Sequence, residues 1–451
     1  MRTLPEILES VYFIGIGGIG MSALARYFHR RGCRVAGYDR TPSPLTRQLE
    51  KEGIGVHYEE ALPAVPGRVD LCVYTPAVPQ THAEYCALRG KGVPCMKRAE
   101  VLGAISREKY TVALAGTHGK TSMTALTALL LRARQPLTAF IGGIANNFQS
   151  NLLDDEGSCC MVVEADEFDR SFLQLTPDIA VVSSMDADHL DIYRTVDALR
   201  EAFDGFSCQI KEGGCLITKP ELRHYFHTPR RVYTYSLQDA AADFRVENLR
   251  IADGSSCFDV CTPCGSIPDL TLPTAGLYNV ENALAAVAVA FVTGMENEKI
   301  RSQLLQYKGV KRRFEYIVRR EGCVYIDDYA HHPNELKACI ASARAWYPDR
   351  KICGVFQPHL YTRTRDFADE FAAVLSTLDA AVLLDIYPAR ELPIEGVDAR
   401  MLLDRMTLGE KYFSTKENLV PLLKKLEPGV ILTMGAGDID RLVDTIKNAF
   451  A

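Results

Sequence analysis

The chain begins with an apolar run, a glycine-rich turn and an amphipathic segment, and this pattern returns along the sequence. Residues 11–14 are apolar and predict a buried strand, whereas residues 21–31 carry apolar side chains at helical spacing. Residues 34–38 and 70–74 predict two further strands. Strands that alternate with helices indicate a parallel sheet covered by helices, so this part of the chain predicts a Rossmann-like domain.

The same pattern starts again near residue 107. Strands are expected at residues 112–115, 160–163 and 179–183, and a helix at residues 121–131. Residues 211–275 differ, because short β-like runs alternate there with glycine and proline. We expect them to form a small β excursion, with a hairpin that turns at residues 263–265, on a central domain built around a parallel sheet of the P-loop ATPase type.

A third unit follows an alanine-rich segment, residues 283–294, which predicts a buried helix. A strand at residues 324–326 and the strand and helix pattern after it indicate a second Rossmann-like sheet. A length of 451 residues agrees with about three domains. We therefore expect an α/β protein with domains at residues 1–106, 107–311 and 312–451.

Composition and charge narrow the class of protein. A formal charge of −6 and a pI near 6.0 argue against binding to nucleic acid or a membrane surface, because both need a basic face. No apolar signal segment or run of eighteen apolar residues occurs, so we expect a cytoplasmic protein. The cysteines show no disulfide spacing, and Cys257, Cys261 and Cys264 lack an obvious fourth zinc ligand. We expect reduced thiols.

The first glycine turn, between the strand at residues 11–14 and its helix, predicts a diphosphate site. It contains Gly15, Gly17, Gly18 and Gly20, with Asp39 at the end of the next strand. This spacing lets a pyrophosphate approach the start of the helix, while Asp39 could bind a ribose hydroxyl. NAD and a UDP-sugar both fit, because the helix amides recognise only the diphosphate.

The second glycine turn predicts a triphosphate site. It consists of Gly116, Thr117, His118 and Gly119, followed by Lys120 and Thr121. Lys120 would contact the β- and γ-phosphates, and the hydroxyl of Thr121 would bind Mg²⁺. Leu114 stands where the longer P-loop pattern has its first glycine. The alternative is therefore an ordinary glycine turn with a solvated lysine.

Polar side chains gather at the ends of the strands beside this turn. Glu164 and His189 follow two of these strands and could bind Mg²⁺; the alternatives are a solvated acidic loop and a hydrogen-bonded loop histidine. Asn279 and Asn282 lie three residues apart at the start of the alanine-rich segment. They could contact the edge of a base or only cap the helix.

Nine motifs extend these observations over the whole chain. They are GIGGIGMS, AGTHGKTS, VEADEFDRSFL, DADHLDIY, NVENALAA, GVKRRFE, DDYAHHPNE, QPHLYTRT and LLDIYPARE. In order and spacing they resemble the Mur ligase family, ATP-dependent amide-forming enzymes of peptidoglycan synthesis. The resemblance implies a UDP-binding first domain, a central ATPase and a third domain that closes over both. It also implies that L-alanine is joined to the lactyl carboxylate of UDP-N-acetylmuramate through an acyl phosphate, with ATP and Mg²⁺.

The resemblance also implies roles for individual residues. Lys120 and Thr121 resemble ATP and Mg²⁺ contacts, Glu164 and His189 metal ligands, Asn279 and Asn282 adenine contacts, Arg313 a phosphate contact, and Asp328 a ribose contact. Tyr329, His331, His359 and Arg363 look like the wall around the reacting carboxyl group and the amino acid. Arg363 would pair with the alanine carboxylate through its planar guanidinium. We expect a monomer or weak homodimer.

Several positions depart from the family pattern. Phe168 replaces a common serine, Tyr278 a histidine, and Leu360 an arginine, which leaves Arg363 as the expected carboxylate anchor. No lysine occurs between His189 and Ile210, so we do not expect the carbamoylated lysine of sister ligases. The alternatives are a recycling ligase that adds a tripeptide to the same sugar nucleotide, a nicotinamide dehydrogenase, and a sugar-nucleotide sensor without turnover.

Overall fold

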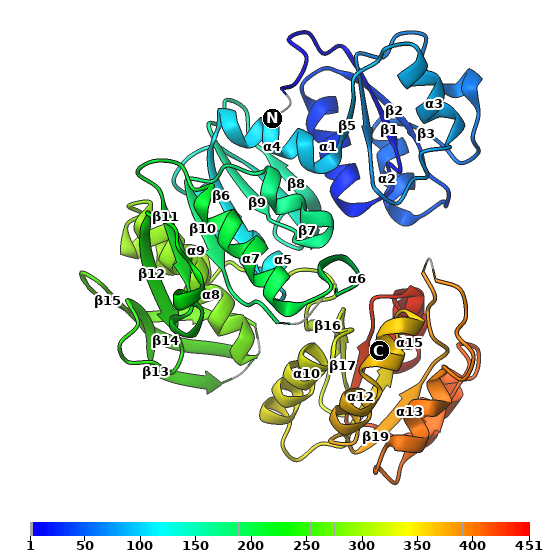
Figure 1. Ribbon diagram of the computed structural model, residues 1–451. Helices are drawn as coiled ribbons and strands as arrows, with labels where there is room; N and C mark the ends of the chain where they lie inside the picture. Colours follow the sequence, from blue (N-terminus) through cyan, green and yellow to red (C-terminus); the bar gives the residue numbers. More distant parts are fainter. Residues whose placement is uncertain (1–2, 187–189, 253, 275, 390) are drawn as a thin grey trace. The chain divides into compact units, whose positions relative to one another are not determined.

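The computed structural model describes residues 3–186, 190–252, 254–274, 276–389 and 391–451. The chain forms two compact units (Figure 1). Unit 1 contains Met1–Pro273 and Val280–Lys308, and unit 2 contains Thr274–Asn279 and Gly309–Ala451. Each unit is built on α/β sheets, in agreement with the predicted fold class.

The first sheet of unit 1 is parallel, with the strand order β3-β2-β1-β4-β5. Its elements are β1 (Ser10–Ile14), α1 (Ile19–Arg30), β2 (Arg34–Tyr38), α2 (Pro44–Lys51), β3 (Gly55–His57), the 3₁₀ turn η1 (Leu62–Ala64), β4 (Leu71–Tyr74), α3 (Ala83–Gly90), β5 (Cys95–Lys97) and α4 (Arg98–Glu108). All five residues of β1 are buried, because helices cover both faces of the sheet. The strands predicted at residues 11–14, 34–38 and 70–74 are confirmed.

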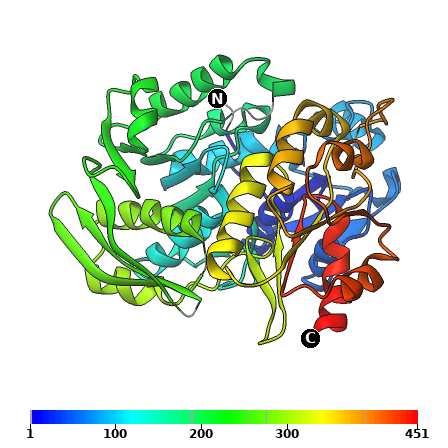
Figure 2. The same ribbon diagram turned by 90° about the horizontal axis from the view of Figure 1, so that it is seen from below.

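The second sheet of unit 1 has ten strands in the order β15-β14-β13-β12-β11-β10-β6-β9-β7-β8. The strands are β6 (Tyr110–Ala115), β7 (Leu137–Ala145), β8 (Ser150–Asp154), β9 (Cys160–Glu164), β10 (Ile179–Val182), β11 (Cys215–Thr218), β12 (Arg231–Ser236), β13 (Phe244–Ala252), β14 (Ser255–Thr262) and β15 (Gly265–Leu272). The excursion predicted at residues 211–275 extends this sheet as the antiparallel ribbon β13 to β15 (Figure 2). Its hairpin turns at Pro263 and Cys264, as predicted.

Helices and 3₁₀ turns connect these strands. They are α5 (Lys120–Arg132), η2 (Phe168–Gln174), α6 (Leu190–Tyr193), α7 (Val196–Cys208), η3 (Pro220–Tyr225), α8 (Leu277–Val292) and α9 (Asn297–Leu304). Residues 283–290 of α8 are all fully buried. An alanine-rich surface packs closely against its neighbours, and the predicted buried helix is confirmed.

A buried polar junction joins the two sheets of unit 1. Asn151 in β8 is fully buried, and its amide group donates hydrogen bonds to the Ile19 carbonyl at 2.5 Å and the Ser22 hydroxyl at 2.9 Å, both in α1. The Asn151 side-chain oxygen accepts a hydrogen bond from Arg26, whose guanidinium also binds Glu52 at 2.7 Å. Helix α1 is therefore fixed to the central sheet at its first turns.

Unit 2 contains one sheet with the strand order β16-β17-β21-β18-β19-β20, in which β16 is antiparallel to β17. Its elements are β16 (Glu315–Arg319), β17 (Val324–Asp328), α10 (Pro333–Trp346), β18 (Ile352–Phe356), α11 (Tyr361–Asp366), α12 (Ala368–Leu375), β19 (Ala380–Leu383), α13 (Ala399–Arg405), β20 (Lys411–Phe413), α14 (Leu419–Leu426), β21 (Val430–Met434), η4 (Asp438–Leu442) and α15 (Val443–Phe450). Separate apolar clusters cover its two faces. This is the second Rossmann-like sheet that the sequence predicts.

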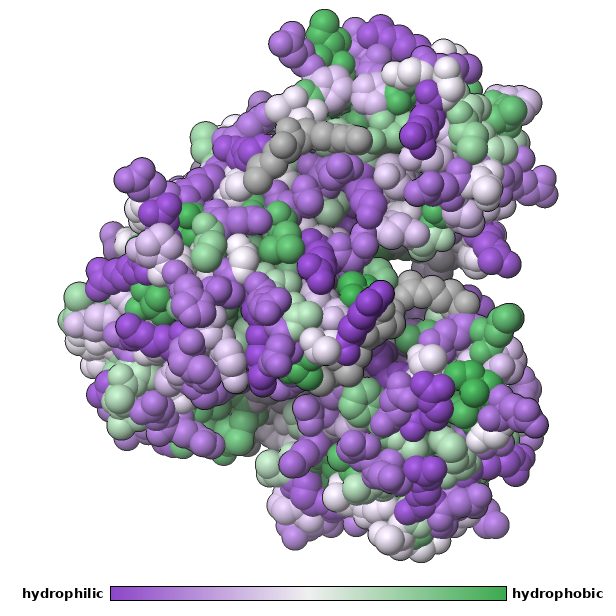
Figure 3. Space-filling model, in the orientation of Figure 1, coloured by the Kyte–Doolittle hydropathy of each residue, from purple (hydrophilic) through white to green (hydrophobic). Residues whose placement is uncertain are grey.

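Among the described residues, no helix is both long and apolar enough to cross a bilayer. On the face shown in Figure 3, hydrophobic residues are scattered among hydrophilic ones. All fourteen cysteines are free thiols.

Candidate functional site

The first glycine turn joins β1 to α1 and is shaped by close contacts. The Gly17 amide donates a hydrogen bond to Asp39 at 2.7 Å, and a Cβ atom at Gly17 would lie 2.7 Å from the same carboxylate oxygen. A Cβ atom at Gly15 would lie 2.6 Å from a Thr75 methyl group, and Gly15 has a φ of +86°. Glycine is therefore required at both positions. The structure brings Asp39 to the turn, as the predicted diphosphate site requires.

The second glycine turn joins β6 to α5, and its glycines have even less room for a side chain than those of the first turn. Gly116 has a φ of +133°, and a Cβ atom there would lie 2.1 Å from the Ser183 hydroxyl. Gly119 has a φ of +79°, and its Cβ atom would lie 2.3 Å from the Asn282 side-chain oxygen. Side chains of the turn glycines therefore do not cover the backbone at the start of α5. The N–H groups there that have no partner within the helix suit a phosphate.

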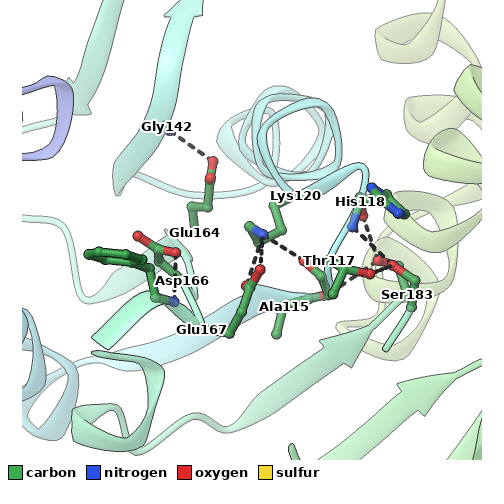
Figure 4. A network of polar contacts seen from close by, with 12 residues as sticks. Ala115, Thr117, His118, Lys120, Gly142, Glu164, Asp166, Glu167 and Ser183 are labelled. Atoms are coloured by element: carbon green, nitrogen blue, oxygen red, sulfur yellow. Dashed lines mark hydrogen bonds and ion pairs between the residues drawn. The ribbon is translucent and has the colours of Figure 1, made fainter. Parts of the chain in front are cut away.

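Lys120 follows this turn and forms a buried ion pair (Figure 4). Its ammonium group donates to both carboxylate oxygens of Glu167 at 2.8 Å and to the Gly116 carbonyl at 2.7 Å. Burial acts to lower the pKa of Lys120, but the Glu167 carboxylate, with Asp166 and Glu164, outweighs it and raises the pKa above its ordinary value. The charged form of Lys120 is therefore favoured at neutral pH.

Glu167 is fully buried, and the sequence did not single it out. It stands in the acidic run 164–169 that follows β9, where spacing alone does not show which carboxylate faces the lysine. The Tyr193 hydroxyl donates to the Glu167 carbonyl at 2.6 Å and holds this part of the loop.

Glu164 lies at the end of β9, beside the same turn (Figure 4). Its carboxylate accepts a hydrogen bond from the Gly142 amide at 3.0 Å, and a Cβ atom at Gly142 would lie 2.2 Å from it. Thr121 is buried in the first turn of α5. Carboxylate and hydroxyl oxygens are ligands that Mg²⁺ prefers, so Glu164 and Thr121 fit this metal. The third predicted ligand, His189, lies outside the described residues.

The segment after β10 forms hydrogen bonds with this glycine turn. The Ser184 hydroxyl accepts hydrogen bonds from the Thr117 hydroxyl and the His118 amide, both at 2.9 Å. The His118 ring lies 2.9 Å from Asp186, and the Asp186 amide donates to the Thr117 hydroxyl at 3.1 Å. Thr117 and His118 therefore hold the shape of the turn through their own side chains.

The two asparagines of α8 are both buried. Asn282 belongs to unit 1 and lies against Gly119, where its side-chain oxygen fills the space that a Cβ atom would need. Asn279 belongs to unit 2, and its backbone N–H donates to the Gly276 carbonyl at 2.9 Å. The structure thus brings Asn282 to the phosphate turn. The adenine contacts stay a prediction.

In unit 2, Asp328 ends β17 and is buried. Its carboxylate accepts hydrogen bonds from the Ala330 amide at 2.7 Å and the Phe314 amide at 2.6 Å. Burial raises the pKa of Asp328 to about 6, although Arg313 and both amides act in the opposite direction. The Arg313 guanidinium lies 5.1 Å from the centre of the Tyr329 ring. Three of the predicted residues therefore meet at this strand end.

A row of aromatic rings continues along the same edge of the sheet. The Tyr329 and His331 ring centres are 5.3 Å apart, those of His331 and His359 are 6.1 Å apart, and His359 stacks on Tyr387 at 5.8 Å. The neighbouring His332 points elsewhere and packs on Phe367. The structure thus brings together three predicted side chains that follow two strands, β17 and β18, at the edge where α/β sheets bind ligands.

The three departures from the family pattern occupy defined places. Phe168 begins η2 in the acidic loop, and the Tyr278 ring lies 6.3 Å from Phe314. Leu360 precedes α11, which carries Arg363, and has a φ of +70° and a ψ of 137°. Such a backbone conformation is strained for leucine.

Comparison with known proteins covers the whole chain. Three family models match: the catalytic domain of the Mur ligase family at residues 10–110, the Mur ligase middle domain at residues 114–290, and the Mur ligase glutamate ligase domain at residues 312–437. Together they span all three sheets.

Relatives and solved structures agree with these models. UDP-N-acetylmuramate–L-alanine ligases from Parabacteroides distasonis and Porphyromonas gingivalis are 47% and 48% identical, each over 98% of this chain and 97% and 98% of their own length. The structure of UDP-N-acetylmuramate-alanine ligase from Thermotoga maritima has a TM-score of 0.82 at 28% identity, over 98% of this chain and 99% of its own. A murein peptide ligase from Psychrobacter arcticus shares the fold, with a TM-score of 0.72 at 21% identity over 98% of both chains. The chain therefore belongs to the Mur ligase family.

Proposed function

We propose that the protein is an ATP-dependent ligase that joins L-alanine to the lactyl carboxylate of UDP-N-acetylmuramate, in the synthesis of peptidoglycan precursors in the cytoplasm. The observation that carries this proposal is the phosphate turn, in which glycines without space for a side chain precede Lys120 and lie beside Glu164. The full-length relatives described above carry this activity in their names.

The reaction must overcome two obstacles. A carboxylate is a poor electrophile, and its charge is repelled by the triphosphate. The lactyl carboxylate attacks the γ-phosphate and releases ADP, which gives an acyl phosphate. The alanine amine then attacks the acyl carbon, and phosphate leaves from a tetrahedral intermediate. Cationic groups that screen charge and fix the line of attack are therefore the main need of the site.

The central residues of unit 1 meet this need. Lys120, kept charged by its surroundings, would leave Glu167 and bind the β- and γ-phosphates. Thr121, Glu164 and His189 would hold Mg²⁺, which supplies further positive charge when bound. Asn282, already beside Gly119, would contact the nucleotide together with Asn279. Gly116, Thr117, His118 and Gly119 would surround the phosphates. The amides of Thr117 and His118, which donate to Ser184, would keep the turn in shape, while the N–H groups at the start of α5 would bind the phosphates.

Unit 2 carries further residues to which we assign a role. Asp328 would bind the ribose, and Arg313 would reach the phosphates. Tyr329, His331 and His359 would surround the acyl group, and Arg363 would bind the alanine carboxylate with its planar fork. The glycines of the first turn, with Asp39, would hold the UDP end of the sugar nucleotide. We propose that the domains are residues 1–106, 107–311 and 312–451.

The test is ADP release by the purified protein with Mg²⁺, ATP and UDP-N-acetylmuramate. Release that depends on L-alanine is the expected result. Release that depends on the preformed tripeptide would instead support the recycling reaction. No release with either acceptor, combined with tight binding of the sugar nucleotide, would support a sensor and overturn the proposal. Absorbance of a bound nicotinamide would indicate a dehydrogenase.

A further inference from the structure

A cavity of about 210 Å³ opens beside the first glycine turn. Its walls include Gly18 and Gly20 of the turn, Lys97 and Arg98 at the start of α4, and Asp166 and Asp169 of the loop after β9. The proposed function uses the glycines for the diphosphate of the sugar nucleotide. It leaves the four charged side chains without a role.

The two cations stand where helix electrostatics disfavour them. Lys97 is the N-cap of α4 and Arg98 its first residue, so both face the positive end of the helix dipole. Cations stabilise a helix at its other end. Their position therefore contributes nothing favourable to α4 itself, and it adds positive charge to a cavity that already has the start of α1 on its wall.

Arg98 also touches the glycine turn directly. A Cβ atom at Gly20 would lie 2.2 Å from one Arg98 terminal nitrogen, so the guanidinium rests on the first turn of α1. A diphosphate that approaches the amides in the first turn of α1, which have no partner within the helix, would come within reach of the guanidinium. Arginine binds such oxygens with two parallel hydrogen bonds.

The present partners of the cations are single carboxylates that solvent can reach. Arg98 lies 3.2 Å from Asp166, and Lys97 lies 2.8 Å from Asp169. The side chains of all four residues are partly exposed, between 24% and 41%. Ion pairs of this kind contribute little to stability, so a ligand with two negative charges can replace them.

We propose that Lys97 and Arg98 bind the diphosphate of the sugar nucleotide and exchange Asp166 and Asp169 for it when the substrate enters. This inference rests on the proposed function, because it takes the first glycine turn as the site of that diphosphate. The exchange assigns opposite effects to the two sides of each pair: the cations attract the substrate, and the carboxylates compete with it.

The test is calorimetric titration of the full chain with UDP and with UDP-N-acetylmuramate. Arg98→Met and Lys97→Met should each weaken binding about tenfold, since each removes a charge-assisted contact. Asp166→Asn should strengthen binding, because it removes the competing carboxylate from Arg98. Arg98→Lys keeps the charge and should give an intermediate affinity if Arg98→Met does not fold. Arg89→Met, at an exposed position of α3 in the same unit, is the matched control and should change nothing.

The outcomes separate the two proposals. If the ion pairs had only a structural role, Arg98→Met, Lys97→Met and Asp166→Asn would change the melting temperature and leave the affinity for UDP equal to that of the wild type, which would overturn the exchange alone. Weaker binding by Asp166→Asn would also overturn it. Failure of the wild type to bind either ligand would overturn the proposed function together with the exchange.

Discussion

The ammonium group of Lys120 and the carboxylate of Glu167 are joined by two hydrogen bonds of 2.8 Å, in a place where Glu167 has no exposed surface. A buried pair of this kind is only weakly screened by solvent or salt. The nucleotide therefore has to compete with a carboxylate of the protein for the lysine. This contact couples the stability of the central sheet to the residue that is expected to hold the phosphates.

Lys120→Ala should abolish ADP formation while the affinity for UDP is kept. It should also lower the free energy of unfolding by about 3–5 kcal/mol, because Glu167 is left buried without its cation. The double variant Lys120→Ala with Glu167→Ala should regain part of this stability and stay inactive. Urea unfolding and an ADP assay measure both effects. Equal stability of the single and double variants would contradict the role of the pair.

Gly119→Ala should weaken ATP binding at least tenfold, because the new methyl group would meet the Asn282 oxygen at 2.3 Å and the backbone has a φ of +79°. Gly157→Ala is the matched control: its φ of +70° is similar, but nothing lies within 4 Å. The control should lose only the backbone cost of about 1–2 kcal/mol in stability and bind ATP normally. Equal losses of ATP affinity would mean that contact with Asn282 is unimportant.

Leu360→Gly should raise the free energy of unfolding by about 1 kcal/mol, since it relieves a φ of +70°. It should also raise the KM for alanine, because the strained backbone positions His359 and the start of the helix that carries Arg363. Glu427→Gly, at a φ of +49° after α14, is the control that should stabilise the protein without affecting KM. If KM stayed unchanged in Leu360→Gly, the strain would have no part in substrate binding.

Arg363→Ala should raise the KM for alanine by about a hundredfold and change the affinity for ATP little, as expected for the loss of a carboxylate partner. Arg365→Ala, two residues along the same helix and paired with Asp366 at 2.8 Å, is the control. Steady-state kinetics with varied alanine distinguish the two variants. An unchanged KM in Arg363→Ala would move the carboxylate anchor to another residue.

Asp328 should make stability depend on pH. Its folded pKa of about 6 exceeds the ordinary value of 3.8, so the folded protein binds this proton more tightly than the unfolded chain. Its contribution to the free energy of unfolding is therefore complete below pH 3.8 and is lost as the pH rises through about 6. The free energy of unfolding differs by about 3 kcal/mol between these limits. Asp328→Asn should remove this decline. Urea unfolding of both proteins from pH 4.5 to 7 measures it, and parallel curves would contradict it.

The sequence predicted features that depend on local patterns. Strand ends, both glycine turns and Glu164 beside the phosphate turn follow from apolar runs and glycine spacing, and each lies where expected. Membership of the Mur ligase family is also confirmed.

Other features depend on contacts between distant parts of the chain. The pairing of Glu167 with Lys120 was missed because several carboxylates of one loop are equivalent in the sequence. Strands β7 and β8 were missed, and the ribbon β13 to β15 was not recognised as an extension of the central sheet, because pairing at a sheet edge leaves no local pattern. The sequence likewise gives no signal for the positive φ of Leu360, since leucine rarely adopts this conformation.

The junction at Asn151 has a consequence for how the chain can be divided. A fragment that ended after the first sheet would leave Arg26 without its amide partner, and the carbonyl of Ile19 would lose its donor. In the remaining fragment, the side-chain amide of Asn151, which is buried in the full chain, would be exposed to solvent. The first two sheets should therefore melt in a single cooperative transition, so that what the chain order presents as two modules is, thermodynamically, one folding unit.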